Sequence, residues 1–361
     1  MKKQTLFTLF IFLISVSIFA SSEPAAGDGK LSVSVMTYNL ENLFDTKHDL
    51  GKEDYTYLPL DFKNSSAEVQ AYCQSLTNEY YKKSCLEFDW SQDIVDQKIK
   101  NLAKVILSYN NGQGADILVF EEVENKNILK QLISKGLANK GYLFVSLIEG
   151  PDTRGIDVGI ISKYPIKKET YHRISMKPYA SRTTRGILQT DFKVANKVVT
   201  IFANHWPSQS NPDGARLNAA KVLKKAALKT KSDLVLALGD FNTTSSDSKN
   251  GITQYILPIF YDVESIARTK YDIKAHGTHW YRGEWESLDK IFVLKASLAK
   301  NKVRPDYRSF EILNLPFMMK KINWTNHDSG QVDVQEIPNR FDTESGEGYS
   351  DHLPVGIRFN L

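Results

Sequence analysis

The chain has 361 residues, of which 42% are hydrophobic and 24% are charged, and its formal net charge is +4. This length predicts one large domain, or one domain with insertions. A net charge so close to zero argues neither for nor against a nucleic-acid partner. After the N-terminal region no hydrophobic stretch is long enough to cross a membrane, which excludes a chain with several spans and predicts a soluble mature protein.

The N-terminal region has the layout of a secretory signal peptide. Lys2 and Lys3 precede an apolar run at residues 6–19, and small residues follow, so cleavage is predicted after Ala20 or Ser22. The run is shorter than the about 20 apolar residues that span a bilayer, although an uncleaved anchor is the alternative. No Cys lies at the junction, which argues against a lipoprotein signal. We therefore expect a signal peptide at residues 1–22, a folded domain at residues 30–361 and a secreted or periplasmic location.

The chain has two cysteines, Cys73 and Cys85. In an exported chain an isolated pair so close in sequence predicts a disulfide, and closing so short a loop is worth about 3 kcal/mol in the chain-entropy model. With no His nearby, the two make a poor zinc site. The surrounding sequence is polar, rich in aromatic residues and irregular, so we expect residues 45–92 to form an insertion that the disulfide holds together.

The rest of the chain alternates helix and strand patterns before it becomes rich in strands. The apolar side chains at residues 93–110 fall on one face, which predicts an amphipathic helix, and the pair of strands around Ala195 and Asn196 predicts a hairpin. Residues 301–348 are expected to form long loops. The other helices are predicted at residues 126–136 and 214–229, and the strands at residues 31–39, 116–120, 142–148, 158–162, 186–194, 197–203, from 234, 286–294 and 353–359.

Polar side chains stand at one end of six of these strands. The apolar run that begins at Leu234 reads as a strand buried on both faces, and it ends on Asp240 and Asn242, which the two-residue spacing directs to one side. A single Asp after a strand is commonly a turn residue or a helix cap. Repetition at one edge of a sheet favours a functional site. The six sets are Asn39 with Glu41, Glu122, Asp157, His205, Asp240 with Asn242, and Asp351 with His352.

The chemistry of these side chains indicates a class of reaction. Carboxylate and amide oxygens, clustered with imidazoles and without thiols, suit Mg²⁺, Mn²⁺ or Ca²⁺ rather than structural zinc. A divalent ion beside pairs of His and carboxylate is what in-line phosphoryl transfer requires, because one group orients water and another protonates the leaving oxygen.

Seven motifs occur in an order that resembles a known family. They are MTYNLEN, DILVFEEVEN, GIDVGIISKYP, FANHWPS, LALGDFN, SLDKIFV and YSDHLPV, and together they extend over residues 33–359. The set resembles the endonuclease/exonuclease/phosphatase superfamily, which includes pancreatic-type deoxyribonucleases, abasic-site endonucleases, bacterial sphingomyelinases and inositol polyphosphate phosphatases. The resemblance implies an α/β (α+β) fold, a four-layer sandwich of two packed mixed β-sheets flanked by helices.

The resemblance also implies a metal site. Asn39, Glu122 and Asp351 match the positions of the metal ligands in the family, and Glu41 lies where some members have an accessory acidic ligand. The implied cofactor is Mg²⁺, with Mn²⁺ or Ca²⁺ as alternatives.

Catalytic roles follow from the same matches. Asp240 and Asn242 match the residues that position the attacking water and the scissile phosphate. His352 matches the catalytic histidine, and Asp289 matches the carboxylate that orients it. His205 matches a second histidine that deoxyribonuclease-like members have.

Two further matches rest on spacing within looser motifs. Asp157 fits the carboxylate that pairs with the second histidine, and Arg185 fits an arginine that contacts phosphate. The chain also departs from the pancreatic deoxyribonucleases, because Glu41 and Glu124 stand where those enzymes reach into the minor groove with arginines.

The function implied is a secreted, divalent-metal-dependent phosphodiesterase, with a nuclease acting on DNA or RNA as the leading hypothesis. A sphingomyelinase-like enzyme acting on membrane lipid is the alternative, and it would need an exposed apolar hairpin, for which residues 279–285 and 316–319 are candidates. A phosphatase of inositol phosphates would need a dense basic pocket, and a surface-binding module without catalysis is the non-enzymatic alternative. We expect a monomer with no obligate protein partner. The arginines that could form such a basic pocket are scattered in sequence, at Arg154, Arg182, Arg185 and Arg282.

Overall fold

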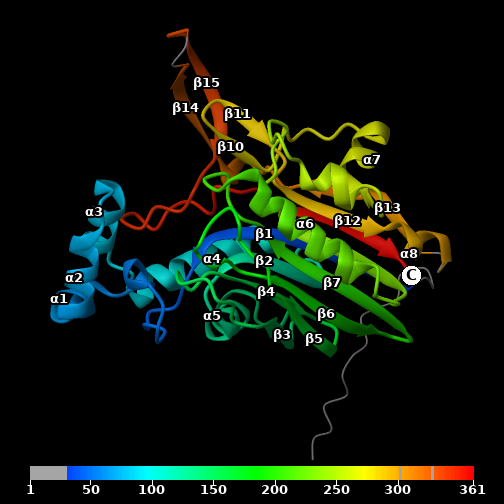
Figure 1. Ribbon diagram of the computed structural model, residues 1–361, viewed down its shortest axis with the longest axis horizontal. Coiled ribbons are helices and arrows are strands. Elements are labelled where there is room, and N and C mark those ends of the chain that lie inside the picture. Colours follow the sequence, from blue (N-terminus) through cyan, green and yellow to red (C-terminus); the bar gives the residue numbers. More distant parts are fainter. Residues whose placement is uncertain (1–30, 301–302, 327–328) are drawn as a thin grey trace, which may run out of the picture. The chain divides into compact units, whose positions relative to one another are not determined.

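The centre of the fold is a pair of six-stranded mixed β-sheets that pack face to face (Figure 1). The computed structural model describes residues 31–300, 303–326 and 329–361. The signal peptide predicted at residues 1–22 lies outside these described residues. In the part that is described, no helix is long and apolar enough to cross a membrane.

The first sheet has the order β13-β16-β1-β2-β4-β3. Its central strands β1 and β2 are parallel, and its other neighbouring pairs are antiparallel. Strand β2 is buried along almost its whole length, as a strand covered on both faces must be. The strands are β1 (Ser32–Leu43), β2 (Ile117–Val123), β3 (Phe144–Leu147), β4 (Asp157–Ser162), β13 (Arg304–Ile312) and β16 (Val355–Asn360).

The second sheet has the order β5-β6-β7-β8-β12-β9, again with one parallel pair, β7 and β8, at its centre. The apolar run at β8 is buried at every residue, which confirms that it is covered on both faces. Strands β1 and β2 pack against β7 and β8 across the sandwich. The strands are β5 (Ile166–His172), β6 (Ile187–Val194), β7 (Lys197–His205), β8 (Leu234–Asp240), β9 (Phe260–Asp262) and β12 (Asp289–Leu294).

Helices form the two outer layers, so the predicted four-layer sandwich is confirmed. Helix α4 (Gln92–Leu107) lies against β1, and α5 (Lys126–Gln131), which continues as a π-helical turn at Leu132–Gly136, lies against β3 and β4. Helix α6 (Asp213–Ala227) buries alanines and Leu223 against Phe202 and Val235 of the second sheet. The remaining helical segments of this layer are a π-helical turn at Ile252–Ile256, α7 (Val263–Lys270) and α8 (Lys295–Lys300).

The insertion is more regular than the sequence suggested. A 3₁₀ turn at Tyr55–Tyr57 is followed by α1 (Leu60–Ser65), α2 (Ala67–Ser75) and α3 (Glu79–Glu87). Cys73 of α2 and Cys85 of α3 form the predicted disulfide, and they pack in a small apolar cluster of their own with Leu58 and Val69. These helices are too short to show a clear apolar periodicity, which explains why the sequence did not reveal them.

The expectation of long loops at residues 301–348 is wrong. This stretch contains the edge strand β13, a 3₁₀ turn at Pro316–Met318, and the antiparallel ribbon of β14 (Met319–Thr325) and β15 (Val332–Pro338). The ribbon is mostly exposed, so its strands lack the apolar alternation that marks a half-buried strand. A second ribbon is formed by β10 (His279–Tyr281) and β11 (Glu284–Glu286).

Candidate active site

Three neighbouring strands of the second sheet bring the predicted catalytic side chains to one edge. Asp240, at the end of β8, stands opposite His205 of β7 in the parallel register and opposite Asp289 of β12 in the antiparallel register. All three side chains are at least 97% buried. The strand pairing itself therefore sets the spacing of this group.

Asp240 is held by amide donors. Its Oδ1 accepts a bond from the backbone N of Asn242 at 2.8 Å, and its Oδ2 accepts one from Asn242 Nδ2 at 2.9 Å and a longer one from Asn39 Nδ2 at 3.4 Å. Asn242 has a positive φ of 47° and also donates to the carbonyl of Trp206. Burial raises the pKa of Asp240, the neighbouring His352 opposes that rise, and Asp289 adds to it.

Gly239 is required at the end of β8. Its φ is +137°, a conformation that other residues rarely adopt, and a Cβ at this position would lie 1.9 Å from the carbonyl oxygen of Asn204 on β7. The glycine in LALGD thus allows β7 and β8 to approach where His205 and Asp240 must meet.

His352 is oriented by Asp289. The imidazole Nδ1 lies 2.7 Å from Asp289 Oδ2, and the backbone N of His352 donates to Ser350 Oγ at 3.1 Å. Burial lowers the pKa of His352, but the carboxylates of Asp289, Asp240 and Asp351 outweigh it and hold that pKa well above its ordinary value. The His352 imidazole is therefore protonated at neutral pH.

His205 has the opposite electrostatic state. Its Nε2 lies 3.6 Å from Asp240 Oδ2 and 3.8 Å from Glu122 Oε1, while its Nδ1 is buried and has no hydrogen-bond partner among the described residues. Burial, together with the charges of Arg185 and Arg154, lowers the pKa of His205 well below its ordinary value. The two histidines beside Asp240 thus differ in protonation.

The predicted pairing of Asp157 with His205 is wrong in this structure. Both carboxylate oxygens of Asp157 accept a bond from the backbone N of Gly150, at 2.8 and 3.0 Å. Burial raises the pKa of Asp157 to about 7. Asp157 therefore holds the turn before β4 rather than the imidazole.

Arg185 also differs from its predicted role. Its Nε donates to the carbonyl of His205 at 3.0 Å and its Nη2 to the carbonyl of Trp206 at 2.8 Å, while Nη1 lies 3.5 Å from Asp152 Oδ2. Burial lowers the pKa of this guanidinium to about 10. With its donors directed at the backbone, Arg185 fixes the end of β7 and with it His205.

The predicted oxygen donors come from three adjacent strands of the first sheet. Asn39 ends the regular pairing of β1 with β2, Glu122 lies at a register break in β2 with a φ of +58°, and Asp351 precedes β16. Ser350 ties this last segment to β1, because its Oγ donates to the carbonyl of Asn39 at 2.7 Å. The side chains of Glu122 and Asp351 are 23% and 33% exposed, so both remain accessible to a ligand.

Glu41, predicted as an accessory metal ligand, is engaged elsewhere. Its Oε1 accepts bonds from Arg340, with Nε at 2.6 Å, and its Oε2 accepts the backbone N of Asp351 at 3.0 Å. Burial and the nearby Asp351 raise the pKa of Glu41 to about 7. Glu41 thus positions Asp351 instead of pointing at the site, and the buried Lys98 supports it by donating to its carbonyl.

The donor set fits a divalent cation, although acidic residues alone do not complete a site. In the described ranges, no group of three or more His, Cys, Asp or Glu side chains is arranged to hold a metal ion. Asn39 offers an amide oxygen, which accepts the backbone N of Glu41 at 3.0 Å, and with the carboxylates of Glu122 and Asp351 it makes a set of hard oxygen donors of the kind that suits Mg²⁺. Two buried carboxyl oxygens nearby, Glu121 Oε2 and Asp289 Oδ1, have no hydrogen-bond partner among the described residues, and burial raises the pKa of Glu121 well above its ordinary value.

Three residues of the site were missed by the sequence analysis. Arg340 lies in residues 301–348, which were predicted to form loops. Glu121 is the first acid of the FEEV motif, and the motif match assigned a role only to the second acid, Glu122. Tyr57 of the insertion lines a cavity together with Glu41 and Arg340. Burial raises the pKa of Tyr57, and the charges of Glu122 and Glu41 add to the rise. The insertion therefore contributes a wall beside Glu41 and Arg340, which only the tertiary structure reveals.

Comparison with known proteins identifies the family. Residues 75–360 match the model of the Endonuclease/Exonuclease/phosphatase family, and a search of curated proteins finds no match. Similar solved structures include a family protein from Bacteroides thetaiotaomicron (14% identity, TM-score 0.53, covering 91% of this chain and 98% of that one) and TDP2 from Caenorhabditis elegans (13%, 0.51, 94% and 77%). A mannosyl-6-phosphatase from Bacteroides thetaiotaomicron is also similar (13%, 0.51, 91% and 100%). At these identities the structures share the fold alone. Because the family match covers most of its length, this chain belongs to the endonuclease/exonuclease/phosphatase family.

Proposed function

We propose that this protein is a divalent-metal-dependent phosphodiesterase that cleaves DNA or RNA by in-line attack of water. Membership of the family indicates a hydrolase of phosphoester bonds. One observation carries the finer proposal: Asp240 is a neighbour of two buried imidazoles, one protonated through Asp289 and one neutral. An acid and a base on either side of one carboxylate are what the hydrolysis of a phosphodiester needs.

Asn39, Glu122 and Asp351 would hold Mg²⁺, with Mn²⁺ or Ca²⁺ as alternatives. When bound, the ion would neutralise charge that develops on the phosphate oxygens. Glu41 and Arg340 act through Asp351, because Glu41 accepts the backbone N of that residue and Arg340 Nη2 lies 3.8 Å from its carboxylate.

The protein's own residues supply the proton transfers. His205 is neutral, so its Nε2 accepts a proton from the attacking water, which Asp240 and Asn242 orient. His352 is protonated, so it donates a proton to the leaving oxygen. Asp289 holds the His352 ring through Nδ1, which leaves Nε2 for the substrate.

A membrane-lipid substrate is less well supported than a nucleic acid. Trp280 of the β10–β11 ribbon packs edge-on against Trp324 at 5.3 Å, and its Nε1 is buried. Met318 is buried too, and Phe317 stacks near Tyr349 at 5.3 Å. Trp280, Phe317 and Met318 of the two candidate segments thus pack internally, although Tyr281 is 62% exposed, and a lipid-inserting element needs its apolar side chains outside.

A phosphomonoester is the second candidate substrate. Arg154, Arg182 and Arg185, which are scattered in sequence, line one cavity beside His205. A dense basic pocket is what a compact phosphorylated substrate requires. One solved structure with this fold is a mannosyl-6-phosphatase. By analogy, this similarity also favours a phosphomonoester substrate.

We also propose that the protein is exported. The signal-peptide pattern at residues 1–22 and the disulfide between Cys73 and Cys85 both suit an oxidising compartment.

The test is a panel of metals and substrates. The purified protein is incubated with Mg²⁺, Mn²⁺ or Ca²⁺ and with plasmid DNA, RNA, sphingomyelin or mannose 6-phosphate. Cleavage of DNA or RNA that depends on added metal supports the proposal. Release of phosphate from the monoester, with nucleic acid left intact, would replace it with the second candidate. Cleavage of the lipid alone would restore the sphingomyelinase-like alternative.

A further inference from the structure

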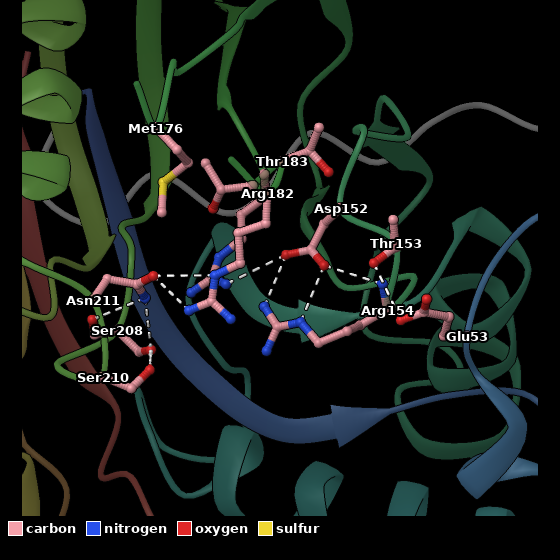
Figure 2. Close-up of a pocket in the computed structure, with 12 residues that line it drawn as sticks. Glu53, Asp152, Thr153, Arg154, Met176, Arg182, Thr183, Ser208, Ser210 and Asn211 are labelled. Atoms are coloured by element: carbon pink, nitrogen blue, oxygen red, sulfur yellow. Dashed lines mark hydrogen bonds and ion pairs between the residues drawn. The ribbon is translucent and has the colours of Figure 1, made fainter. Parts of the chain in front are cut away.

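A polar cavity of about 260 Å³ (Figure 2) is lined in part by Arg185, which donates to the carbonyl of His205. Four loop segments form the cavity: the segment after β1 supplies Glu53, the segment between β3 and β4 supplies Asp152 and Arg154, the segment between β5 and β6 supplies Arg182, and the segment between β7 and α6 supplies Asn211. This volume is far larger than the about 30 Å³ that one water molecule occupies in the liquid. The cavity therefore has room for a ligand group.

The residues that line the cavity determine which chemical class of ligand it can bind. Met176 is the only apolar side chain among the lining residues, so the cavity offers no platform on which a nucleobase or an acyl chain could pack. Hydroxyl groups from Thr184, Ser208 and Ser210 join the arginines. Such a lining favours a small, strongly hydrated anion.

The charges of the lining leave a positive excess. Asp152 pairs with Arg154 through two bonds, at 3.1 and 2.8 Å, and lies 3.5 Å from Arg185. Arg182 donates from Nε and Nη2 to the single amide oxygen of Asn211, at 3.1 and 2.5 Å, so its bonds go to a neutral acceptor (Figure 2). With Glu53 counted beside Asp152, three guanidinium groups face two carboxylates.

The cavity shares a wall with the catalytic centre. Arg185 lines it, and the same side chain donates to the carbonyls of His205 and Trp206. Arg185 thus links the cavity to the residue whose imidazole faces Asp240. A substrate with two consecutive phosphates, joined by a single sugar, would present one to each of these neighbouring sites.

We propose that this cavity binds the phosphate next to the scissile one, with Arg182 as its principal ligand and Arg154 as the second. This inference rests on the proposed function, because it assigns the neighbouring part of the same substrate. Arginine suits the role because its guanidinium carries five N–H donors, so with Nε and Nη2 of Arg182 on Asn211 its Nη1 remains for the phosphate. The phosphate can come from a nucleic-acid backbone, as a diester, or from a nucleotide end, as a monoester.

The experiment compares substrates that differ only in the neighbouring phosphate. Thymidine bearing a p-nitrophenyl phosphodiester on one hydroxyl is prepared with the other hydroxyl free, phosphorylated, or capped as a methyl phosphodiester, in both orientations. We expect kcat/KM to rise on the order of tenfold with the added phosphate in one orientation, as for hydrogen bonds to a charged group. A preference for the methyl-capped form identifies a backbone phosphate, and a preference for the free monoester identifies a nucleotide end.

Variants show whether Arg182 causes the preference. The quantity compared is kcat/KM for the substrate with the neighbouring phosphate divided by kcat/KM for the substrate without it. In Arg182→Gln this ratio should fall to near one. Arg182→Lys should restore part of it, because lysine keeps the positive charge but lacks the planar guanidinium. Arg308→Gln is the matched control, since Arg308 is an exposed arginine of β13 outside the cavity, and it should keep the full ratio. Thermal unfolding of each variant separates loss of the ligand from loss of the fold.

Two results would overturn the inference: wild-type protein that shows no preference in either orientation, or Arg182→Gln protein that keeps the preference. If the wild type cleaves none of the substrates, the proposed function fails, and binding decides the subsite separately. Calorimetric titration then compares thymidine 3′,5′-bisphosphate with thymidine 5′-monophosphate and thymidine 3′-monophosphate. Tighter binding of the bisphosphate than of either monophosphate, lost in Arg182→Gln, supports the subsite without any turnover, and equal binding rejects it.

Discussion

The Nδ1 atom of His352 lies 2.7 Å from Oδ2 of Asp289, and both side chains are buried beside Asp240. The two residues are 63 positions apart in the chain, and the antiparallel pairing of β12 with β8 places Asp289 opposite Asp240. This contact fixes the ring and keeps it protonated, which is the basis of the role we assign to His352.

Replacing Asp289 with Asn should impair His352. The amide cannot stabilise the imidazolium, so we expect kcat to fall by on the order of 10²–10⁴, the usual range for a general acid–base group. Activity falls as pH rises through the pKa of the protonated histidine. Because Asp289 raises that pKa, the alkaline limb of the pH–rate profile should move to lower pH in the variant. Asp191→Asn, in the same sheet and bonded to Thr200, is the control and should leave the profile unchanged.

His205→Ala should reduce turnover by on the order of 10²–10⁴ as well, because it removes the neutral imidazole beside Asp240. His172→Ala provides the comparison, since His172 lies in the same sheet and bonds to Gln189 away from the site. Steady-state kinetics on a phosphodiester substrate measure both. Full activity in His205→Ala would indicate a mechanism with one histidine.

Asp157→Asn should stabilise the protein above neutral pH. The pKa of the buried Asp157 is raised to about 7, so the folded state binds a proton between pH 4 and 7 that the unfolded state has released. Its contribution to stability is therefore present at low pH and is lost as pH rises towards 7. We expect the variant to be more stable by ~2 kcal/mol at pH 8 and unchanged at pH 4 in urea unfolding.

The same variant tests the role of Asp157. An amide at this position still accepts the bond from Gly150, so activity should be retained if the residue holds only that turn. A large loss of kcat at unchanged stability would return Asp157 to the pairing with His205 that the sequence predicted.

Gly239→Ala should destabilise the fold at the site. The added Cβ would meet the backbone of Asn204 at 1.9 Å, so β7 and β8 must separate, and we expect a loss of at least ~2 kcal/mol together with activity. Gly330→Ala is the control, because Gly330 also has a positive φ but its Cβ would meet no atom within 4 Å. Equal losses in the two variants would trace the effect to φ rather than to the contact between strands.

The central strands and their polar ends could be predicted from sequence. Apolar runs such as the one at β8 border chemically active residues, so the sequence predicted Asp240 and His205 at the ends of two strands and His352 just before the last one. Parallel strands β7 and β8 then place two of these side by side, as the pattern implies.

Other parts of the site depend on loops, and spacing along the chain does not report where a loop side chain points. Asp157 begins a strand as expected, yet the turn at Gly150 takes its carboxylate. Arg185 is likewise turned to backbone carbonyls. The contact of Glu41 with Arg340 joins residues 299 positions apart, and no local pattern encodes it.

The most direct test of the central claim is the rate of bis-(p-nitrophenyl) phosphate hydrolysis with Mg²⁺, measured for the wild type, Asp240→Ala and Asp262→Ala. Asp262 ends the neighbouring strand β9 of the same sheet, where its side chain caps α7. The account predicts metal-dependent hydrolysis by the wild type and by Asp262→Ala, and a loss of on the order of 10³-fold or more in Asp240→Ala. Hydrolysis at the wild-type rate in Asp240→Ala would contradict it, because the end of β8 would then not be the place where the phosphodiester is cleaved.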